Sequence, residues 1–178
     1  MICYYLFKTA KGEAGFALSP QGICRVILPG AKPAAIKQEL LEIYPELSSG
    51  CFPPPPLAQR FVEEAKAYFE GQPVALDHPL DLQEASEFEW KVYRALQKVD
   101  YGQVRTYGWL AEEAGSPAGA RAVGAALSKN PVPLIVPCHR IVRSDGSLGG
   151  FSAAGGTKLK QWMLKLEAKR NFTADKRE

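Results

Sequence analysis

The sequence has no long apolar run, no paired-cysteine spacing and few histidines. No stretch approaches the ~20 apolar residues of a membrane-spanning helix. Residues 1–8 lack the basic segment and small-residue cleavage site of a secretory signal peptide. The four cysteines form no CxxC pair, and the two histidines form no HxxxH pair. These absences predict a cytoplasmic protein in which Cys3, Cys24, Cys51 and Cys138 are reduced thiols.

The same spacing disfavours a metal site. Cys138 and His139 are too close in sequence to act together as natural zinc ligands. Cys3, Cys24 and His78 supply only three ligands, whereas structural zinc takes four. We therefore expect neither a structural zinc ion nor another metal.

Positive charge is concentrated in the second half of the chain. Residues 1–80 carry 7 Lys and Arg against 8 Asp and Glu, whereas residues from 101 onward carry 12 against 6. A basic half favours a polyanionic partner, although a solvated basic surface explains the bias equally well.

The first half alternates short strand-like and helix-like segments, separated by turn residues. The patterns predict strands over 2–8, 14–19 and 22–28, and helices over 32–44 and 57–70. The four prolines at 53–56 favour a stiff extended connector over a ligand for a proline-reading domain. A boundary is expected near 82–86, which divides the chain into residues 1–84, 85–170 and a polar tail of 171–178.

The second half begins with helical signals. Ser86 and Glu89 form a capping-box pattern before an apolar stripe that ends at Val99. A short extended segment over 103–106 precedes a helix over 107–114 capped by Thr106, and Ser116-Pro117 is expected to open another helix that ends near 128. Two helices joined by a short glycine-containing turn are typical of a helix-turn-helix.

The second of these helices consists mostly of alanine and glycine, with Arg121 as its one long cation. Small side chains let a helix backbone approach another surface closely. The sequence does not say whether that surface is a ligand or a neighbouring helix.

A cysteine and a histidine follow an apolar run. Residues 133–136 are expected to form a buried strand that leads to Cys138 and His139. An imidazole nearby can lower the pKa of a thiol, but adjacent strand residues point to opposite faces, so a water could relay the proton. Glu167, on a helix expected over 157–169, is the candidate to orient His139. An inert buried thiol is the alternative.

These residues resemble a known family. The segment 135–142, Ile-Val-Pro-Cys-His-Arg-Ile-Val, is similar to the active-site motif of the O6-alkylguanine-DNA alkyltransferases, also called methylated-DNA–protein-cysteine methyltransferases. The resemblance extends through 101–107, 120–124, 130–133 and 155–167, and it is loose in the first half.

The resemblance implies a fold and a reaction. The fold would be α+β, with a ribonuclease-H-like α/β roll (a small antiparallel sheet with helices) before a mostly helical domain with a helix-turn-helix. Cys138 would irreversibly take an alkyl group from O6 of guanine, or from O4 of thymine, in double-stranded DNA. The protein would act once, as a monomer without a cofactor, and would associate with the nucleoid in a prokaryote.

The resemblance also implies a role for each site residue. His139 would assist Cys138 as base, Glu167 would hold His139, Tyr107 would donate its hydroxyl to the guanine ring, and Asn130 would brace the turn before Cys138. Arg121 would replace the flipped base in the stack, while the small-residue helix lies in the minor groove. The implied DNA-binding residues are Ala120, Arg121, Ala122, Gly124, Ser128 and Thr106, and the implied pocket residues are Ile141, Phe151, Ser152 and Pro133.

The sequence departs from the family pattern in the pocket loop. The loop from Phe151 to Gly156 is longer than usual, and Phe151 stands where tyrosine is common. Two alternatives fit less well. A non-catalytic damage-binding protein would lack Cys138, and a cysteine hydrolase would leave the small-residue helix unexplained.

Overall fold

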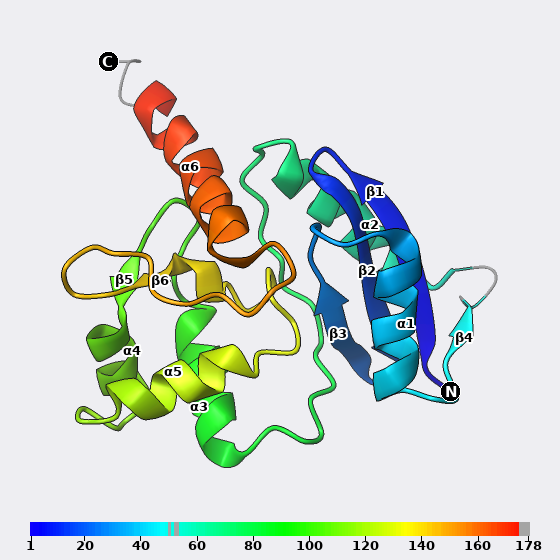
Figure 1. Cartoon of the computed structure of the whole chain (residues 1–178), viewed down its shortest axis with the longest axis horizontal. Helices are drawn as coiled ribbons and strands as arrows, with labels where there is room; N and C mark the ends of the chain where they lie inside the picture. Colours follow the sequence, from blue (N-terminus) through cyan, green and yellow to red (C-terminus); the bar gives the residue numbers. More distant parts are fainter. Residues whose placement is uncertain (50, 52–53, 175–178) are drawn as a thin grey trace. The chain divides into compact units, whose positions relative to one another are not determined.

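The computed structural model describes residues 1–49, 51 and 54–174, which form two units (Figure 1). Unit 1 comprises Met1–Leu82 with Ala153–Gly155, and unit 2 comprises Gln83–Ser152 and Gly156–Glu178. The chain is a mixed α+β protein with a small sheet and six α-helices among the described residues. No helix in these ranges is long and apolar enough to cross a membrane.

Unit 1 is built on a four-stranded sheet with the order β3-β2-β1-β4. Strands β1 (Cys3–Thr9), β2 (Gly12–Ser19) and β3 (Gly22–Ile27) pair antiparallel, and the three predicted strands are confirmed. The two-residue strand β4 (Ser48–Ser49) pairs parallel with β1, so that Ser48 lies beside Cys3. The sequence patterns missed β4, because two residues are too few for an alternating pattern.

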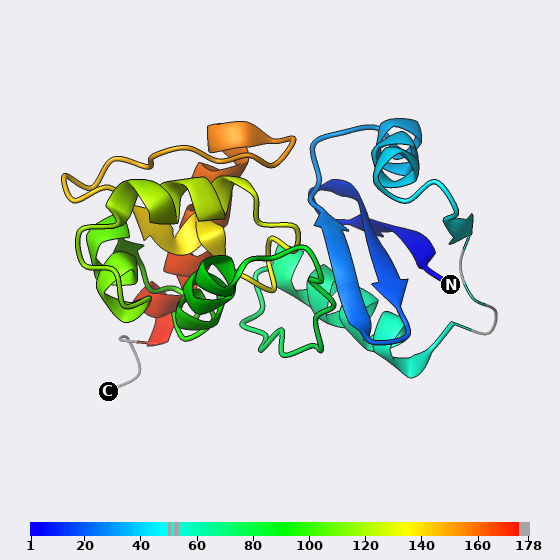
Figure 2. The ribbon, with the colours of Figure 1, turned by 90° about the horizontal axis from the view of Figure 1, so that it is seen from below.

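Helices α1 (Pro33–Ile43) and α2 (Pro56–Phe69) cover opposite faces of this sheet (Figures 1 and 2). Adjacent residues of β2 point to opposite faces. Ala17 packs with Ile36 and Leu40 of α1, whereas the ring of Phe16 lies 4.8 Å from that of Phe61 of α2. The strand is therefore buried on both sides, which explains why its sequence reads as a continuous apolar run.

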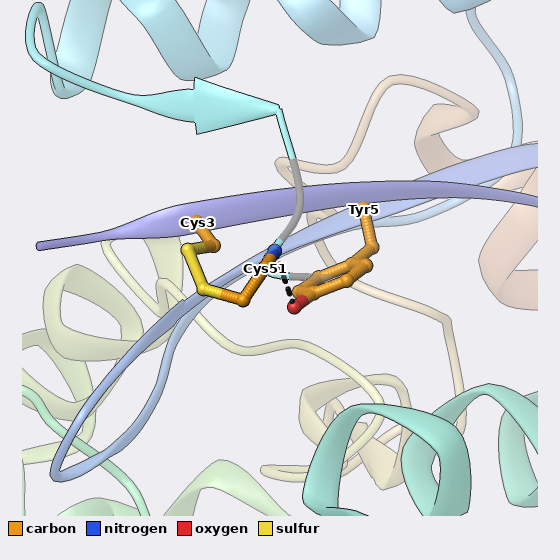
Figure 3. Close-up of a disulfide and its surroundings, with 3 residues drawn as sticks. All are labelled: Cys3, Tyr5 and Cys51. Atoms are coloured by element: carbon orange, nitrogen blue, oxygen red, sulfur yellow. Dashed lines mark hydrogen bonds between the residues drawn. A yellow bond between two sulfur atoms is a disulfide. The ribbon is translucent and has the colours of Figure 1, made fainter. Parts of the chain in front are cut away.

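A disulfide between Cys3 and Cys51 contradicts the expectation that all four cysteines are reduced (Figure 3). The pairing of β4 with β1 brings the two residues together, with 6.1 Å between their Cα atoms. The backbone N–H of Cys51 also donates to the Tyr5 hydroxyl oxygen at 3.0 Å. The two cysteines are 48 residues apart in the sequence, so the spacing of the cysteines could not predict that they pair. Cys24 and Cys138 are free and buried.

The proline-rich connector is only partly described. Pro53 lies outside the described residues, and Pro55 has the extended angles φ −59° and ψ 150°. Pro56 is the first residue of α2, a position where proline is tolerated because its missing N–H has no helical partner. The helix expected from residue 57 thus begins within the proline run.

Unit 2 packs three short helices together. Helix α3 (Glu87–Leu96) begins with the predicted capping box, in which Ser86 and Glu89 exchange both hydrogen bonds. The two-residue strand β5 (Arg105–Thr106) leads to α4 (Tyr107–Glu113), which is capped by the Thr106 hydroxyl. Helices α3, α4 and α5 (Ala120–Ser128) then pack against one another.

The expected start of α5 at Ser116-Pro117 is wrong. The Ser116 N–H donates to the Ala111 carbonyl at 2.8 Å, and the Gly119 N–H donates to the Ser116 carbonyl at 2.7 Å. Ser116 therefore completes the turn that ends α4, and α5 begins four residues later, after Gly119.

The rest of unit 2 contains the 3₁₀ helix η1 (Cys138–Arg140), strand β6 (Ile141–Val142) and helix α6 (Gly156–Ala174). Strand β6 pairs parallel with β5, with Thr106 opposite Val142. Helix α6 continues past the expected end at residue 169 and includes much of the expected polar tail. No glycine or proline interrupts the sequence between its ends, so each added residue propagates the helix. Residues 175–178 lie outside the described part.

Candidate active site

The segment that leads to Cys138 is a turn held by Asn130. The Asn130 amide donates to the Val136 carbonyl at 2.9 Å, and its side-chain oxygen accepts the Val132 N–H at 3.1 Å. Leu134, between these partners, has a φ of +81°, which is uncommon for a residue with a side chain. Asn130 thus braces a strained turn with both ends of its amide, as the resemblance implies.

The buried strand expected over 133–136 is not formed. These residues are buried, but Pro133 and Val136 form only an isolated bridge, and Cys138 to Arg140 form η1. Pro133 and Pro137 have no N–H to donate to a strand neighbour. An apolar run indicates burial, and here the prolines decide the backbone conformation. Because Cys138 and His139 lie in η1, the rule that strand neighbours face apart does not apply to them.

The Cys138 side chain is almost fully buried, with 7% of its surface exposed. Burial raises the pKa of the thiol, while a hydrogen bond with the Asn130 side chain and the positive charge of Lys160 act to lower it. The net shift is upward. The resting thiol is therefore protonated at neutral pH, and its reaction requires a base.

His139 is fully buried and bound to Glu167. Its Nε2 lies 2.6 Å from Glu167 Oε1, across 28 residues of sequence. Burial lowers the pKa of His139, so the imidazole is neutral at neutral pH. With Nε2–H donated to the carboxylate, Nδ1 is the nitrogen that can take a proton.

Arg140 completes this buried network, a role that the sequence reasoning missed. Its Nε donates to Glu167 Oε2 at 3.0 Å, and its Nη1 donates to the Val99 carbonyl at 2.7 Å. The Gly102 N–H also donates to Glu167 at 2.9 Å. Burial pushes the pKa of Glu167 up, but the hydrogen bond from His139 and the charge of Arg140 outweigh it and lower that pKa to about 2. Glu167 is thus an ionised carboxylate that holds His139 in one tautomer.

Tyr107 lies where three segments meet. It is the first residue of α4, and Gly124 of α5 faces its ring. A Cβ atom at Gly149 would lie 2.7 Å from the Tyr107 hydroxyl oxygen, so the loop after β6 approaches the phenol as closely as a glycine allows. Burial raises the pKa of Tyr107, which keeps the hydroxyl protonated and able to donate.

The exposed face of α5 carries the small residues. Val123, Ala126 and Leu127 are buried against the unit, and the Tyr93 hydroxyl donates to the Ala126 carbonyl at 3.1 Å. The exposed residues are Ala120, Arg121, Ala122, Ala125 and Ser128. Close packing against another helix of unit 2 therefore does not explain the small residues on this face.

The other expected site residues differ in their surroundings. Ile141 and Pro133 are buried, Phe151 is partly buried and Ser152 is exposed. The hydroxyls of Thr106 and Ser128 make local hydrogen bonds, to the Trp109 N–H and the Ala125 carbonyl. Both hydroxyls are therefore already engaged within the protein.

Lys160 is a second residue that the sequence reasoning missed. It is fully buried, and its Nζ donates to the Ile141 carbonyl at 2.6 Å and the Gly150 carbonyl at 3.3 Å. Lys160 and Glu167 are seven residues apart and thus lie on the same face of α6 as Met163. A lysine on the same helix face as Met163 and Glu167 was the signal that could have revealed Lys160.

Metal ligands do not gather in the described ranges, where no three His, Cys, Asp or Glu side chains are grouped to hold a metal ion. Cys3, one of the three ligands considered from the sequence, is engaged in the disulfide.

Residues 87–169 match the family model described as 6-O-methylguanine DNA methyltransferase, DNA binding domain. The methylated-DNA–protein-cysteine methyltransferase of Mycolicibacterium paratuberculosis is 47% identical over 106 residues, which cover 60% of this chain and 62% of that protein. The protein of the same name from Methanosarcina acetivorans is 42% identical, over 61% of this chain and 70% of that protein. The matched segment thus spans less than two thirds of the first of these relatives.

Solved structures match over nearly the whole chain. The crystal structure of the Mycobacterium tuberculosis O6-methylguanine methyltransferase has a TM-score of 0.76 and 30% identity, and covers 96% of this chain and 94% of that chain. A crystal structure of the M. tuberculosis protein in complex with DNA has a TM-score of 0.75 and 30% identity, and covers 94% of each chain. With these matches, the chain belongs to the methylated-DNA–protein-cysteine methyltransferase family.

Proposed function

We propose that this protein repairs alkylated DNA by moving an alkyl group from O6 of guanine to the sulfur of Cys138. The observation that carries the proposal is a buried thiol beside a neutral histidine that an ionised glutamate holds in place. This arrangement can deprotonate a sulfur that is otherwise a thiol. The names of the relatives, and the DNA complex of one of them, support the substrate class.

The chemical step begins with the loss of the Cys138 proton, which His139 accepts, either directly or through a water. The thiolate attacks the alkyl carbon, a sulfur–carbon bond forms, and the bond from that carbon to O6 breaks. The electron pair of that bond stays on the guanine, which then takes up one proton. The proton that His139 accepted balances this uptake, directly or through solvent, and Tyr107 donates a hydrogen bond to the leaving guanine, because its raised pKa keeps the hydroxyl protonated.

The thioether is the end of the reaction. No nucleophile reopens a carbon–sulfur bond under these conditions, so each molecule acts once. The alkyl group passes directly between two atoms, and the proposed step therefore uses no cofactor or metal. O4-alkylthymine presents the same kind of alkyl–oxygen bond and is a second proposed substrate.

DNA is proposed to bind through the exposed face of α5, as a monomeric complex. Helices α4 and α5 would act as a helix-turn-helix, with small residues against the minor groove, where close approach is needed. Arg121 would enter the stack when the base is flipped out, an extrusion that requires a few kcal/mol. Unit 1, with helices on a small antiparallel sheet, would be the ribonuclease-H-like roll. We propose the cytoplasm as the site of action.

The test is intact-mass spectrometry after incubation with duplex DNA that contains O6-methylguanine. We expect one methyl group per protein molecule, mapped to Cys138, with no further turnover. Cys138→Ser should take no methyl group, whereas Cys24→Ser, which removes the other free thiol, should react normally. Multiple turnovers, or transfer by Cys138→Ser, would contradict the proposal.

Base flipping has a separate test with Arg121→Ala. The variant should react more slowly with duplex DNA but at a near-normal rate with the free base O6-benzylguanine. Lys129→Ala removes a nearby exposed cation and serves as the charge-matched control. Equal losses on both substrates would argue against a role for Arg121 in extrusion.

A further inference from the structure

Lys160 is a buried cation without a carboxylate partner in the part of unit 2 that the structure describes. Its side chain is fully buried, and its two hydrogen-bond acceptors are the neutral carbonyls of Ile141 and Gly150. Lysine is almost never fully buried unless it is paired. A buried charge of this kind opposes folding, so its presence calls for another reason.

The two carbonyls connect Lys160 to the backbone next to the reactive residue and to the pocket loop. The Ile141 N–H donates to the Cys138 carbonyl, so the Ile141 end of this link is one hydrogen bond from Cys138. Gly150 precedes Phe151 in the loop after β6. These two hydrogen bonds hold the ammonium at the residue that follows η1 and at the pocket loop.

The electrostatic effects between the two groups are reciprocal. Burial lowers the pKa of Lys160, which is about 8 after the opposing, upward effect of a charged Cys138 is included. In the other direction, the charge of Lys160 lowers the pKa of the Cys138 thiol, against the upward effect of burial. Other titratable or charged groups around the pair come from four elements or loops and are Tyr93, Tyr107, His139 and Arg143.

We infer that Lys160 is a positioning residue whose buried ammonium stabilises the thiolate of Cys138. This inference rests on the proposed function only in taking Cys138 as the reactive residue. His139 removes the proton, and Lys160 stabilises the negative charge that remains on sulfur. The neutral carbonyl partners suit this role, because a carboxylate partner would cancel the positive charge.

The first test measures the alkylation of Cys138 by iodoacetamide as a function of pH, without DNA, in a Cys24→Ser background. Lys160→Met keeps the length of the side chain and removes its charge. We expect the midpoint of the pH profile to rise by about one unit, which makes alkylation roughly tenfold slower at neutral pH. Lys160→Arg should stay near the parent midpoint. Lys165→Met, an exposed lysine on the same helix, should match the parent protein.

The pH midpoint separates this role from a structural one. If Lys160 only holds the loop, Lys160→Met will change the rate at every pH by the same factor and leave the midpoint in place. An unchanged midpoint overturns the inference.

A measurement on the Lys160-containing protein keeps the test valid if Lys160→Met does not fold. The pKa of Lys160 can be followed by NMR of its ε-methylene group in Cys138→Asp, which places a negative charge where the thiolate forms, and in Cys138→Ser, which is neutral there. The pKa of Lys160 should be higher in Cys138→Asp than in Cys138→Ser. Equal pKa values in the two variants overturn the inference.

The outcomes also distinguish this inference from the proposed function. If the iodoacetamide profile depends on Lys160 but the protein takes no methyl group from O6-methylguanine DNA, the proposed function fails alone. If methyl transfer occurs and the profile is independent of Lys160, the inference fails alone.

Discussion

The interiors of the two units are filled by different chemistry. In unit 1 the rings of Phe7, Phe16 and Phe61 pack together between β1, β2 and α2. In unit 2 Glu167 lies between His139 and Arg140, with 1% of its surface exposed. Aromatic burial stabilises a fold directly, whereas buried charges often stabilise less than apolar residues of the same volume would. The charges of unit 2 are therefore better explained by chemistry than by stability.

The two histidines, His78 in unit 1 and His139 in unit 2, also differ in their surroundings. In each, Nε2 is hydrogen-bonded to a glutamate carboxylate, at 2.7 Å between His78 and Glu64 and at 2.6 Å between His139 and Glu167. In unit 1, however, Arg60 lies 3.2 Å from the other ring nitrogen of His78, and Glu64 is 27% exposed. A histidine–glutamate pair alone is thus no sign of catalysis. The adjacent thiol distinguishes His139.

The largest expected effect separates these two histidines. His139→Ala should slow methyl transfer by a factor of about 10² to 10⁴, because it removes the proposed base. His78→Ala should leave the rate unchanged. Single-turnover transfer from O6-methylguanine DNA measures both, and similar losses in the two variants would remove the distinction between the units.

Glu167→Ala should destabilise unit 2 by roughly 3–5 kcal/mol, because it leaves the buried Arg140 without its partner. Glu64→Ala, in the partly exposed pair, should destabilise unit 1 by roughly 1–3 kcal/mol. The three tryptophans, Trp90, Trp109 and Trp162, all lie in unit 2, so their fluorescence measures the unfolding of unit 2, and the circular-dichroism transition measures the effect of Glu64→Ala on unit 1. An equal effect of the two substitutions would contradict the contrast in burial.

Acid should destabilise unit 2 by protonating the Glu167 carboxylate. The pKa of Glu167 is lowered to about 2 in the folded state, against ~4.3 when unfolded. Its contribution, on the order of 3 kcal/mol, is fully present above the unfolded pKa and is lost as the pH falls through the folded pKa. Tryptophan fluorescence during urea unfolding between these two pH values measures the slope. Glu167→Gln should flatten it, and an unchanged slope would assign the acid sensitivity to other groups.

Removing the disulfide should weaken unit 1 by roughly 2–4 kcal/mol, since it frees a loop of 48 residues in the unfolded chain. Cys51→Ser should lower the circular-dichroism melting temperature and leave the tryptophan transition of unit 2 in place. Cys24→Ser is the control for losing a cysteine without losing the bond. A shift of the tryptophan transition would mean that the two units do not unfold independently.

The smallest expected effect is that of Gly149→Ala. It should lower the stability of unit 2 by about 1–2 kcal/mol, because φ at this position is +71° and strains a residue with a side chain. The added Cβ would also displace the Tyr107 hydroxyl, so transfer should slow as well. Gly146→Ala has a similar φ of +83° but meets no atom within 4 Å. It should therefore show the strain without the loss of rate. Equal rates in the two variants would argue that the Gly149–Tyr107 contact is unimportant.

Local sequence by itself determined most of the helices and strands. The capping box at Ser86, the cap at Thr106 and the three main strands of unit 1 depend on residues within a few positions of each other. The sequence around Cys138 also pointed to His139 and Glu167, and the resemblance added Asn130. Residue types and the spacing of a motif can be read from the sequence without a structure.

Only the tertiary structure decided the rest. It replaced the expected strand with η1, joined Cys3 to Cys51, and brought Arg140 and Lys160 into the site. It also set the direction of the pKa shift of Cys138, which is upward because burial outweighs the charge of Lys160. These features depend on desolvation and on contacts between distant residues, and neither the periodicity nor the spacing of a sequence measures them.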